Sequence, residues 1–429
     1  MLAYRSAISR SLRIGAADDA FLPKEERQLT AHLDSAYESP YRWVMLALGW
    51  SVYFCFGLIS FSLAPLVTPI MKDLNLTYTQ LGIAAGAWPL IYIAAAYPEG
   101  LAIDRMGIKK SLLIGALCVS ASGALRAMAN DFAGLFFAVA VFGLGAPLIS
   151  VGLPKLIATW FSGQERGTAS GIYYTGATAG IAVSLSATNA ILLPLVRHWR
   201  ICFLIYGIAT LIVAMVWVRL ARSPSAGSAR ASGGDQKTWD AMRKLVKHGS
   251  IWLVIIIGST TFIVSHSLNN WLPKILESQA FTAAMAGIIA AIFSLFRIIG
   301  GLSIPRISSS VISRKLMTSG LLLATTLSIV AIQSGLELPL VLGIITAGVC
   351  LGAVAPLLLT LLMDMPAVGS KNMGAGGGLY FSFGEIGGVL GPVTIGYMRD
   401  VTGSFYTGLT VLAAVIGCMV VLSIFVKET

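Results

Sequence analysis

Long apolar segments alternate with short polar ones along most of the chain from residue 43 onward. A helix needs about 20 apolar residues to cross a bilayer, and segments of that length recur throughout. They predict an all-α polytopic membrane protein. The twelve expected membrane-spanning helices are residues 43–66, 80–100, 110–129, 133–157, 168–193, 201–220, 250–273, 283–305, 316–334, 338–362, 374–398 and 404–426.

The charge distribution fits a membrane protein and not a nucleic-acid surface. Charged residues make up 11% of the chain, against about 25% in soluble domains. Most of the 30 Lys and Arg residues lie in segments that are cytoplasmic if both termini are inside. The exceptions are Lys72, Arg197, Arg200, Lys274 and Arg399 on the other side, and Arg126 and Arg297 within spans. We therefore expect a multi-pass protein of a bacterial inner membrane, in contact with the lipid bilayer and with no nucleic-acid partner.

A polar segment between the second and third spans carries a recognisable pattern, formed by Gly100, Asp104, Arg105, Gly107, Lys109 and Lys110. It resembles the loop between helices 2 and 3 of the major facilitator superfamily, G-x-x-x-D-R-x-G-x-(K/R)-(K/R). The resemblance covers nearly all of residues 43–426. It implies a secondary transporter with two pseudo-symmetric six-helix halves that works by alternating access. We expect the two glycines to form a tight turn and all six residues to control a cytoplasmic gate.

Internal similarity supports two related halves. The segment 167–173 at the start of the fifth span matches 374–380 at the start of the eleventh. The expected organisation is a cytoplasmic tail at 1–42, a six-helix half at 43–220, a cytoplasmic linker at 221–249 and a second half at 250–429. In the second copy of the loop, Pro305 stands where Asp104 stands in the first. Gating is therefore expected to depend mainly on Asp104.

Arg297 is the strongest candidate for substrate binding, because a charge inside a span is costly and usually functional. Arg297 to Gly300 resembles the Arg-x-x-Gly pattern of nitrate and monocarboxylate transporters, which implies that the arginine contacts an anionic substrate. A planar guanidinium suits a carboxylate or oxyanion, since it donates paired hydrogen bonds. The alternative is a structural arginine that tethers helix ends.

Glu385 and His266 are the candidates for proton coupling. Glu385 lies about 11 residues into its span, at a depth close to that of Arg297. A buried carboxyl that binds and releases a proton would serve coupling, whereas a permanent Arg297–Glu385 ion pair would only join two helices. His266 could relay protons or could be a packing residue.

Further polar and aromatic side chains complete the expected binding region. Asn269 and Asn270 could interrupt their helix and turn amide donors toward an anion, and their segment resembles the cyanate and nitroimidazole branch of the superfamily. The tyrosines Tyr53, Tyr173 and Tyr380 could clamp the substrate or could be packing residues. Arg126, near the outer end of its span, also resembles that branch, but the simpler expectation is that its charged end reaches the membrane surface.

Several motifs are missing from the sequence. It contains no phosphate-binding loop and no cluster of Cys and His at metal-ligand spacing. We therefore expect that the protein is not an enzyme and binds no cofactor or metal. Together with the resemblance and the candidate residues above, this favours a monomeric, proton-coupled transporter of a small organic or inorganic anion. The alternatives are an exporter of drug-like or metabolite molecules and a membrane scaffold or sensor that transports nothing.

Overall fold

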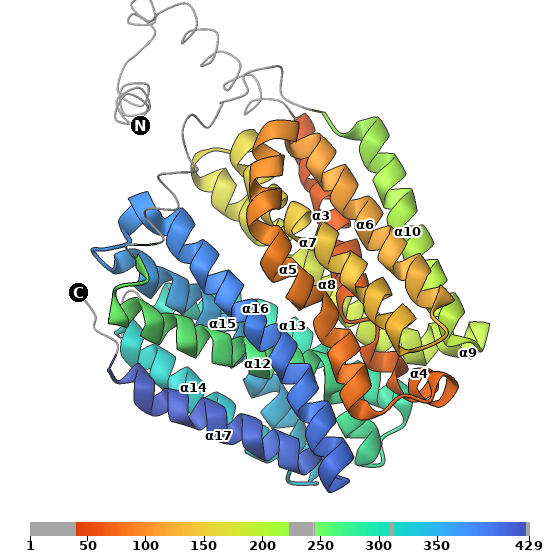
Figure 1. The fold of residues 1–429 in the computed structure, drawn as a ribbon. Coiled ribbons are helices and arrows are strands. Elements are labelled where there is room, and N and C mark those ends of the chain that lie inside the picture. Colours follow the sequence, from red (N-terminus) through yellow and green to blue (C-terminus); the bar gives the residue numbers. More distant parts are fainter. Residues whose placement is uncertain (1–39, 223–242, 244, 309–312, 426–429) are drawn as a thin grey trace, which may run out of the picture.

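The computed structural model describes residues 40–222, 243, 245–308 and 313–425, and these residues form helices and no strand (Figure 1). We call α3 to α10 the first half and α12 to α17 the second half. The first half consists of α3 (Tyr41–Ser60), η2 (Ala64–Leu66), α4 (Val67–Leu74), α5 (Tyr78–Met106), α6 (Ile108–Met128), α7 (Phe132–Trp160), α8 (Gly163–Ala187), η3 (Thr188–Leu192), α9 (Leu193–Val196) and α10 (Trp199–Leu220). The second half consists of α12 (Gly249–Ser278), α13 (Ala283–Ser308), α14 (Arg314–Ile332), α15 (Glu337–Asp364), α16 (Gly369–Thr402) and α17 (Phe405–Ser423).

The prediction of an all-α polytopic membrane protein is confirmed. Eleven of the described helical segments are long and apolar enough to cross a membrane, and α16 is a further long helix. Each predicted span overlaps one of these segments. Most of the predicted tail and linker lies outside the described residues.

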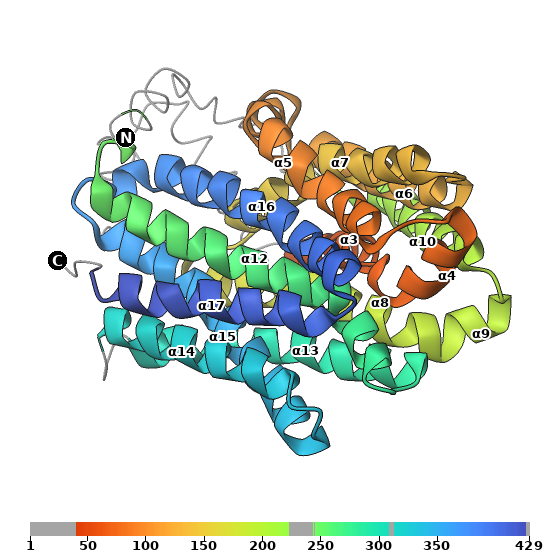
Figure 2. The same cartoon turned by 60° about the horizontal axis from the view of Figure 1, so that its bottom comes forward.

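The two halves lie beside each other, with the first half red to light green and the second green to blue (Figures 1 and 2). Within the first half, α3 packs on α8, α5 packs on α7, and α6 packs on α7 and α10. Within the second half, α12 packs on α16, α13 packs on α15, and α14 packs on α15 and α17. Between the halves, α5 contacts α16 and α8 contacts α13. Side chains from these four helices and from α3 and α12 can therefore meet in one region.

Polar contacts between the halves gather at the end where α4 leads into α5, which we call the distal end. There the Asp400 carboxylate of α16 accepts hydrogen bonds from the backbone N–H groups of Tyr78 (3.1 Å) and Thr79 (2.7 Å). These are the first residues of α5, whose N–H groups have no partner within the helix. Lys274 of α12 donates to the Thr68 hydroxyl of α4 at 2.7 Å. The second half thus caps and holds the first half at this end.

Candidate functional site

Arg297 lies half-buried on α13, between the two halves. Its charge is within electrostatic range of His266 on α12 and Tyr174 on α8, and its guanidinium carbon is 5.9 Å from the centre of the Phe293 ring. Within the described part of the chain, no hydrogen bond or ion pair reaches the guanidinium. A cation on a spanning helix without an acidic partner can receive an anion from outside the protein.

Glu385 on α16 faces His266 on α12. The His266 Nε2 and Glu385 Oε2 atoms are 3.7 Å apart, and both residues are 7% exposed. A side-chain carbon on Gly388 would lie 2.6 Å from Glu385 Oε2 and 3.0 Å from the His266 ring, so this glycine leaves room for the pair. The alternative of a permanent Arg297–Glu385 ion pair is wrong, because the basic group that faces this carboxyl is His266. No third His, Cys, Asp or Glu among the described residues joins them to form a metal site.

Three tyrosines of the first half lie together, and one of them, Tyr174, lies near Arg297. The ring centre of Tyr53 on α3 is 5.8 Å from that of Tyr173 and 6.4 Å from that of Tyr174, both on α8. Tyr174 is 57% exposed and lies within electrostatic range of Arg297 and Tyr380. Tyr380 itself is completely buried on α16. The first half therefore presents Tyr174, one ring of a group of three, toward the cation of the second half.

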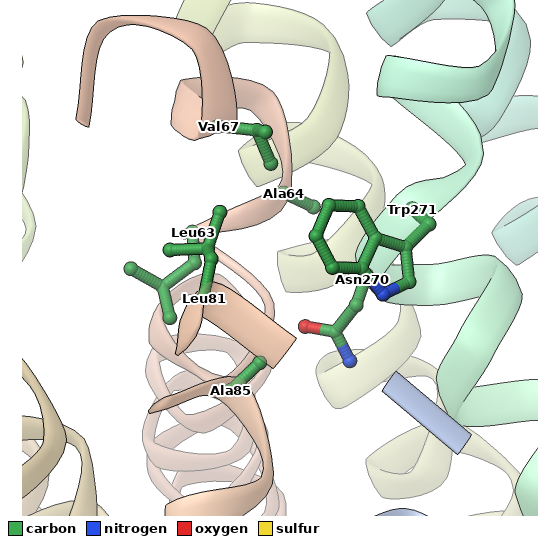
Figure 3. A pocket seen from close by; sticks show the side chains of 7 residues that line it. All are labelled: Leu63, Ala64, Val67, Leu81, Ala85, Asn270 and Trp271. Carbon is green, nitrogen blue, oxygen red and sulfur yellow. The ribbon is translucent and has the colours of Figure 1, made fainter. Parts of the chain in front are cut away.

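Asn269 and Asn270 do not interrupt their helix, and that prediction is wrong. Helix α12 runs unbroken through both residues. Each side-chain amide donates to the carbonyl one turn earlier, Asn269 to Ser265 at 2.8 Å and Asn270 to His266 at 2.9 Å. These bonds keep the polar groups satisfied without unwinding the helix. Figure 3 shows Asn270 and Trp271 facing the η2 segment and α5 across a small pocket lined by Leu63, Ala64, Val67, Leu81, Ala85, Asn270 and Trp271.

The signature segment departs from the expected turn at its first glycine. Helix α5 continues through Gly100 to Met106, and only Gly107 has a positive φ, at 82°. The prediction of a turn at both glycines is therefore wrong. Asp104 Oδ1 accepts a hydrogen bond from the Lys155 Nζ of α7 at 2.7 Å. Arg105, Lys109 and Lys110 lie beside this pair at the junction of α5 and α6. The gating role of these residues stays a prediction.

Sequence analysis missed one polar residue and misjudged another. Glu99 is half-buried on α5 and accepts a hydrogen bond at 3.1 Å from the backbone N–H of Leu148, which follows Pro147 in α7. Glu99 lies near the end of a predicted span, where a charged residue is not unusual, so the sequence contains no signal for it. Arg126 is completely buried, so the prediction that its charged end reaches the membrane surface is wrong. Its neighbours come from two other helices, which the sequence pattern of its own helix does not reveal.

Comparison with known proteins places the chain in one protein family. The model of the Major Facilitator Superfamily matches residues 49–392. The "Probable galactarate/D-glucarate transporter GudP" of Escherichia coli (strain K12) is 24% identical, over 86% of this chain and 92% of its own length. The 2-nitroimidazole transporter of the same organism is 27% identical, over 56% of this chain and 60% of its own length. A solved bacterial homologue of the human lysosomal transporter Spinster, inward-facing and occupied, has a TM-score of 0.66 at 16% identity and covers 91% of this chain and 96% of its own.

Proposed function

Since the chain belongs to the Major Facilitator Superfamily, we propose that this secondary transporter carries a small organic anion and that Arg297 binds it. The observation that carries the proposal is the Arg297 guanidinium, which has no hydrogen-bonding or acidic partner among the described residues. A guanidinium inside a membrane-spanning region gains most from a carboxylate that accepts two of its hydrogen bonds. A relative whose name refers to sugar diacids supports an anionic cargo.

The tyrosines suit the remainder of such a substrate. Tyr53, Tyr173 and Tyr174 supply hydroxyl groups from the first half, and Arg297 supplies the charge from the second. A hydroxylated acid has a carboxylate for the guanidinium and hydroxyls for the phenols. A substrate held from both sides would favour the state in which the halves approach each other, which alternating access requires.

His266 and Glu385 are the groups through which we propose proton coupling. The two side chains are buried and adjacent, so a proton can bind to either the basic nitrogen or the carboxyl group next to it. Arg297 lies within electrostatic range of His266. An anion on Arg297 would offset the positive charge near the pair and would favour proton uptake by it. Substrate and proton would then bind together, as symport requires.

We infer the orientation of the protein in the membrane from the positive residues. With both termini in the cytoplasm of a bacterial cell, the distal end faces outward across the inner membrane. The contacts of Asp400 and Lys274 then close the outer side, which corresponds to an inward-facing state.

Counterflow in proteoliposomes tests the proposed cargo. Vesicles that contain the purified protein and are loaded with unlabelled D-glucarate should accumulate external labelled D-glucarate transiently, and protein-free vesicles should not. A panel of monocarboxylates, dicarboxylates and amphipathic cations should compete according to negative charge. Competition by the cations alone would contradict an anion site and would favour an exporter of drug-like molecules. No counterflow with any member of the panel would favour a scaffold.

A further inference from the structure

Arg126 on α6 is a completely buried guanidinium inside the first half. Its Nη1 donates to the backbone carbonyl of Ile59 at 2.7 Å and to the Ser62 hydroxyl at 2.9 Å. No carboxylate among the described residues pairs with it, and its Nε and Nη2 atoms have no partner there. Burial of a charge under these conditions is costly. This cost indicates that the two hydrogen bonds of Arg126 have a structural or functional role.

Those bonds hold a break in the first span. Helix α3 ends at Ser60, residues 61–63 form a turn, and the chain resumes as η2 at Ala64. The last carbonyls of a helix have no partner within it, and a cation near them is favourable. The Ile59 carbonyl also accepts from the Ser62 hydroxyl at 3.0 Å, and Arg126 adds a charged donor to both Ile59 and Ser62, which ties the turn to α6. The guanidinium therefore fixes where the first span bends.

The bend places an aromatic ring on His266 of the other half. The Phe61 ring is 5.6 Å from the His266 ring, edge to face, and the Trp88 ring of α5 is 5.4 Å from it. We call Phe61 and Trp88 the aromatic cover. Phe142 links Arg126 to this cover a second time, because its ring centre lies 5.9 Å from the guanidinium carbon and 5.4 Å from the Trp88 ring. Figure 3 shows the next residues of the broken segment, Leu63 and Ala64, facing α12 as well.

We propose that Arg126 is a positioning residue for the His266–Glu385 pair: by fixing the bend at residues 61–63 it holds the aromatic cover over His266 and keeps water from the pair. The proposal rests on the proposed function of that pair. The cover belongs to the first half and His266 to the second, so the cover exists only while the halves meet here. Separation of the halves at the distal end would then expose the pair to the outer side, which links proton access to conformation.

Chemical modification of His266 tests this directly in the detergent-solubilised full-length protein. Diethyl pyrocarbonate modifies accessible imidazoles, and mass spectrometry reports the rate at each histidine. His198 and His248 are exposed and serve as internal references. Arg126→Met should raise the rate at His266 about tenfold relative to these references, since loss of charged hydrogen bonds favours local opening. Arg126→Lys, which keeps the charge and a donor, should restore part of the protection.

Ser120→Ala is the matched control. Ser120 is a buried residue of the same helix, and its hydroxyl donates to the Gly207 carbonyl of α10 at 2.8 Å and not to the bend. Its loss should leave the His266 rate unchanged. If His266 stays as protected in folded Arg126→Met as in the parent, the proposal is overturned. If Arg126→Met does not fold, Ser62→Ala decides: a raised rate at His266 supports the proposal, and an unchanged rate overturns it.

This readout is independent of transport. It needs no substrate and no proton gradient, so it reports the cover whether or not the pair couples protons. Failure of the proposed coupling appears elsewhere, as proton-driven accumulation that survives the loss of the Glu385 charge. The two ideas can therefore fail separately.

Discussion

Two arginines within the spans have opposite surroundings. Arg126 is completely buried and bonds to a backbone carbonyl and a serine hydroxyl, whereas Arg297 is half-buried and bonds to none of the described residues. Local sequence marked both as unusual, because charge in a span is rare. Only the packing separates a guanidinium that holds the protein's own backbone from one that is available to a ligand.

Arg297→Lys should impair transport strongly. Lysine keeps the positive charge but loses the planar arrangement of donors that matches a carboxylate. We expect kcat/KM for the anion to fall about tenfold or more, with folded protein still in the membrane. Initial uptake rates in proteoliposomes measure the effect. Arg219→Lys, the same change at an exposed position of α10, is the control. Parental rates in the Arg297 variant would show that the arginine does not bind the substrate.

Glu385→Gln should separate exchange from accumulation. Glutamine mimics the protonated acid and cannot release a proton, so substrate exchange should continue while uptake driven by a proton gradient should be lost. Counterflow and acid-driven uptake, measured on the same vesicles, give the two quantities. Persistent acid-driven accumulation in the variant would mean that Glu385 is only a structural neighbour of His266 and that another group couples protons.

The sequence allowed these residues to be predicted as candidates, but it did not allow their contacts to be predicted. The similar depths of Arg297 and Glu385 made an ion pair plausible, but depth does not give the direction of a side chain around its helix. His266 could face Glu385 because Gly388 leaves room for its ring, and this depends on how α12 and α16 pack. The asparagines were misread for a related reason. A short side-chain amide can donate a hydrogen bond to a carbonyl of its own helix and need not interrupt that helix.

At the scale of the elements, a carboxylate joins α5 to α7 at a proline. Pro147 has no N–H and disturbs the helix around it, and the N–H of the next residue, Leu148, donates to Glu99. Helix positions follow from apolar periodicity, and the twelve spans could be predicted for that reason. Kinks and the bonds that fill them depend on a second helix. The sequence of α7 alone does not provide that partner.

Glu99→Leu should destabilise the protein, and Glu99→Gln should largely not. Leucine leaves the buried N–H of Leu148 without an acceptor, which costs about 1–3 kcal/mol, whereas the glutamine oxygen can still accept the bond. Thermal unfolding in detergent compares the two variants. Glu337→Leu, at an exposed position of α15, controls for the added side-chain hydrophobicity. If Gln destabilises as much as Leu, the charge matters and the hydrogen bond does not.

At the scale of the whole molecule, the two halves meet through unlike contacts at their distal end. The repeat in the sequence indicated two related halves, and the basic residues indicated an orientation. Neither could predict the state of the transporter, because that state depends on contacts between residues far apart in sequence. Asp400 and Tyr78 are such a pair, separated by more than 300 positions. The capping of α5 by α16 is visible only once the halves are placed together.

Asp400→Asn should shift the protein toward a state that is open at the distal end. The Asp400 carboxylate accepts bonds from Tyr78 and Thr79 and carries a negative charge at the start of α5, and asparagine keeps one acceptor and no charge. Loss of these bonds between the halves should raise the open population about tenfold, while bonds within each half stay intact. Ala85, which is buried and lines the small pocket between the halves, is the reporter position (Figure 3).

With the five native cysteines replaced, the maleimide reactivity of Ala85→Cys should rise about tenfold when Asp400→Asn is added. Asp131→Asn is the matched control at the same end. The Asp131 carboxylate accepts from the Gly134 N–H at 2.7 Å and caps α7 within the first half alone. Asparagine keeps the acceptor at this helix cap and removes only the charge, as in Asp400→Asn, but this carboxylate does not join the halves, so the reactivity should stay at the parental value. Equal reactivity in both variants would show that Asp400 caps a helix but does not hold the two halves together.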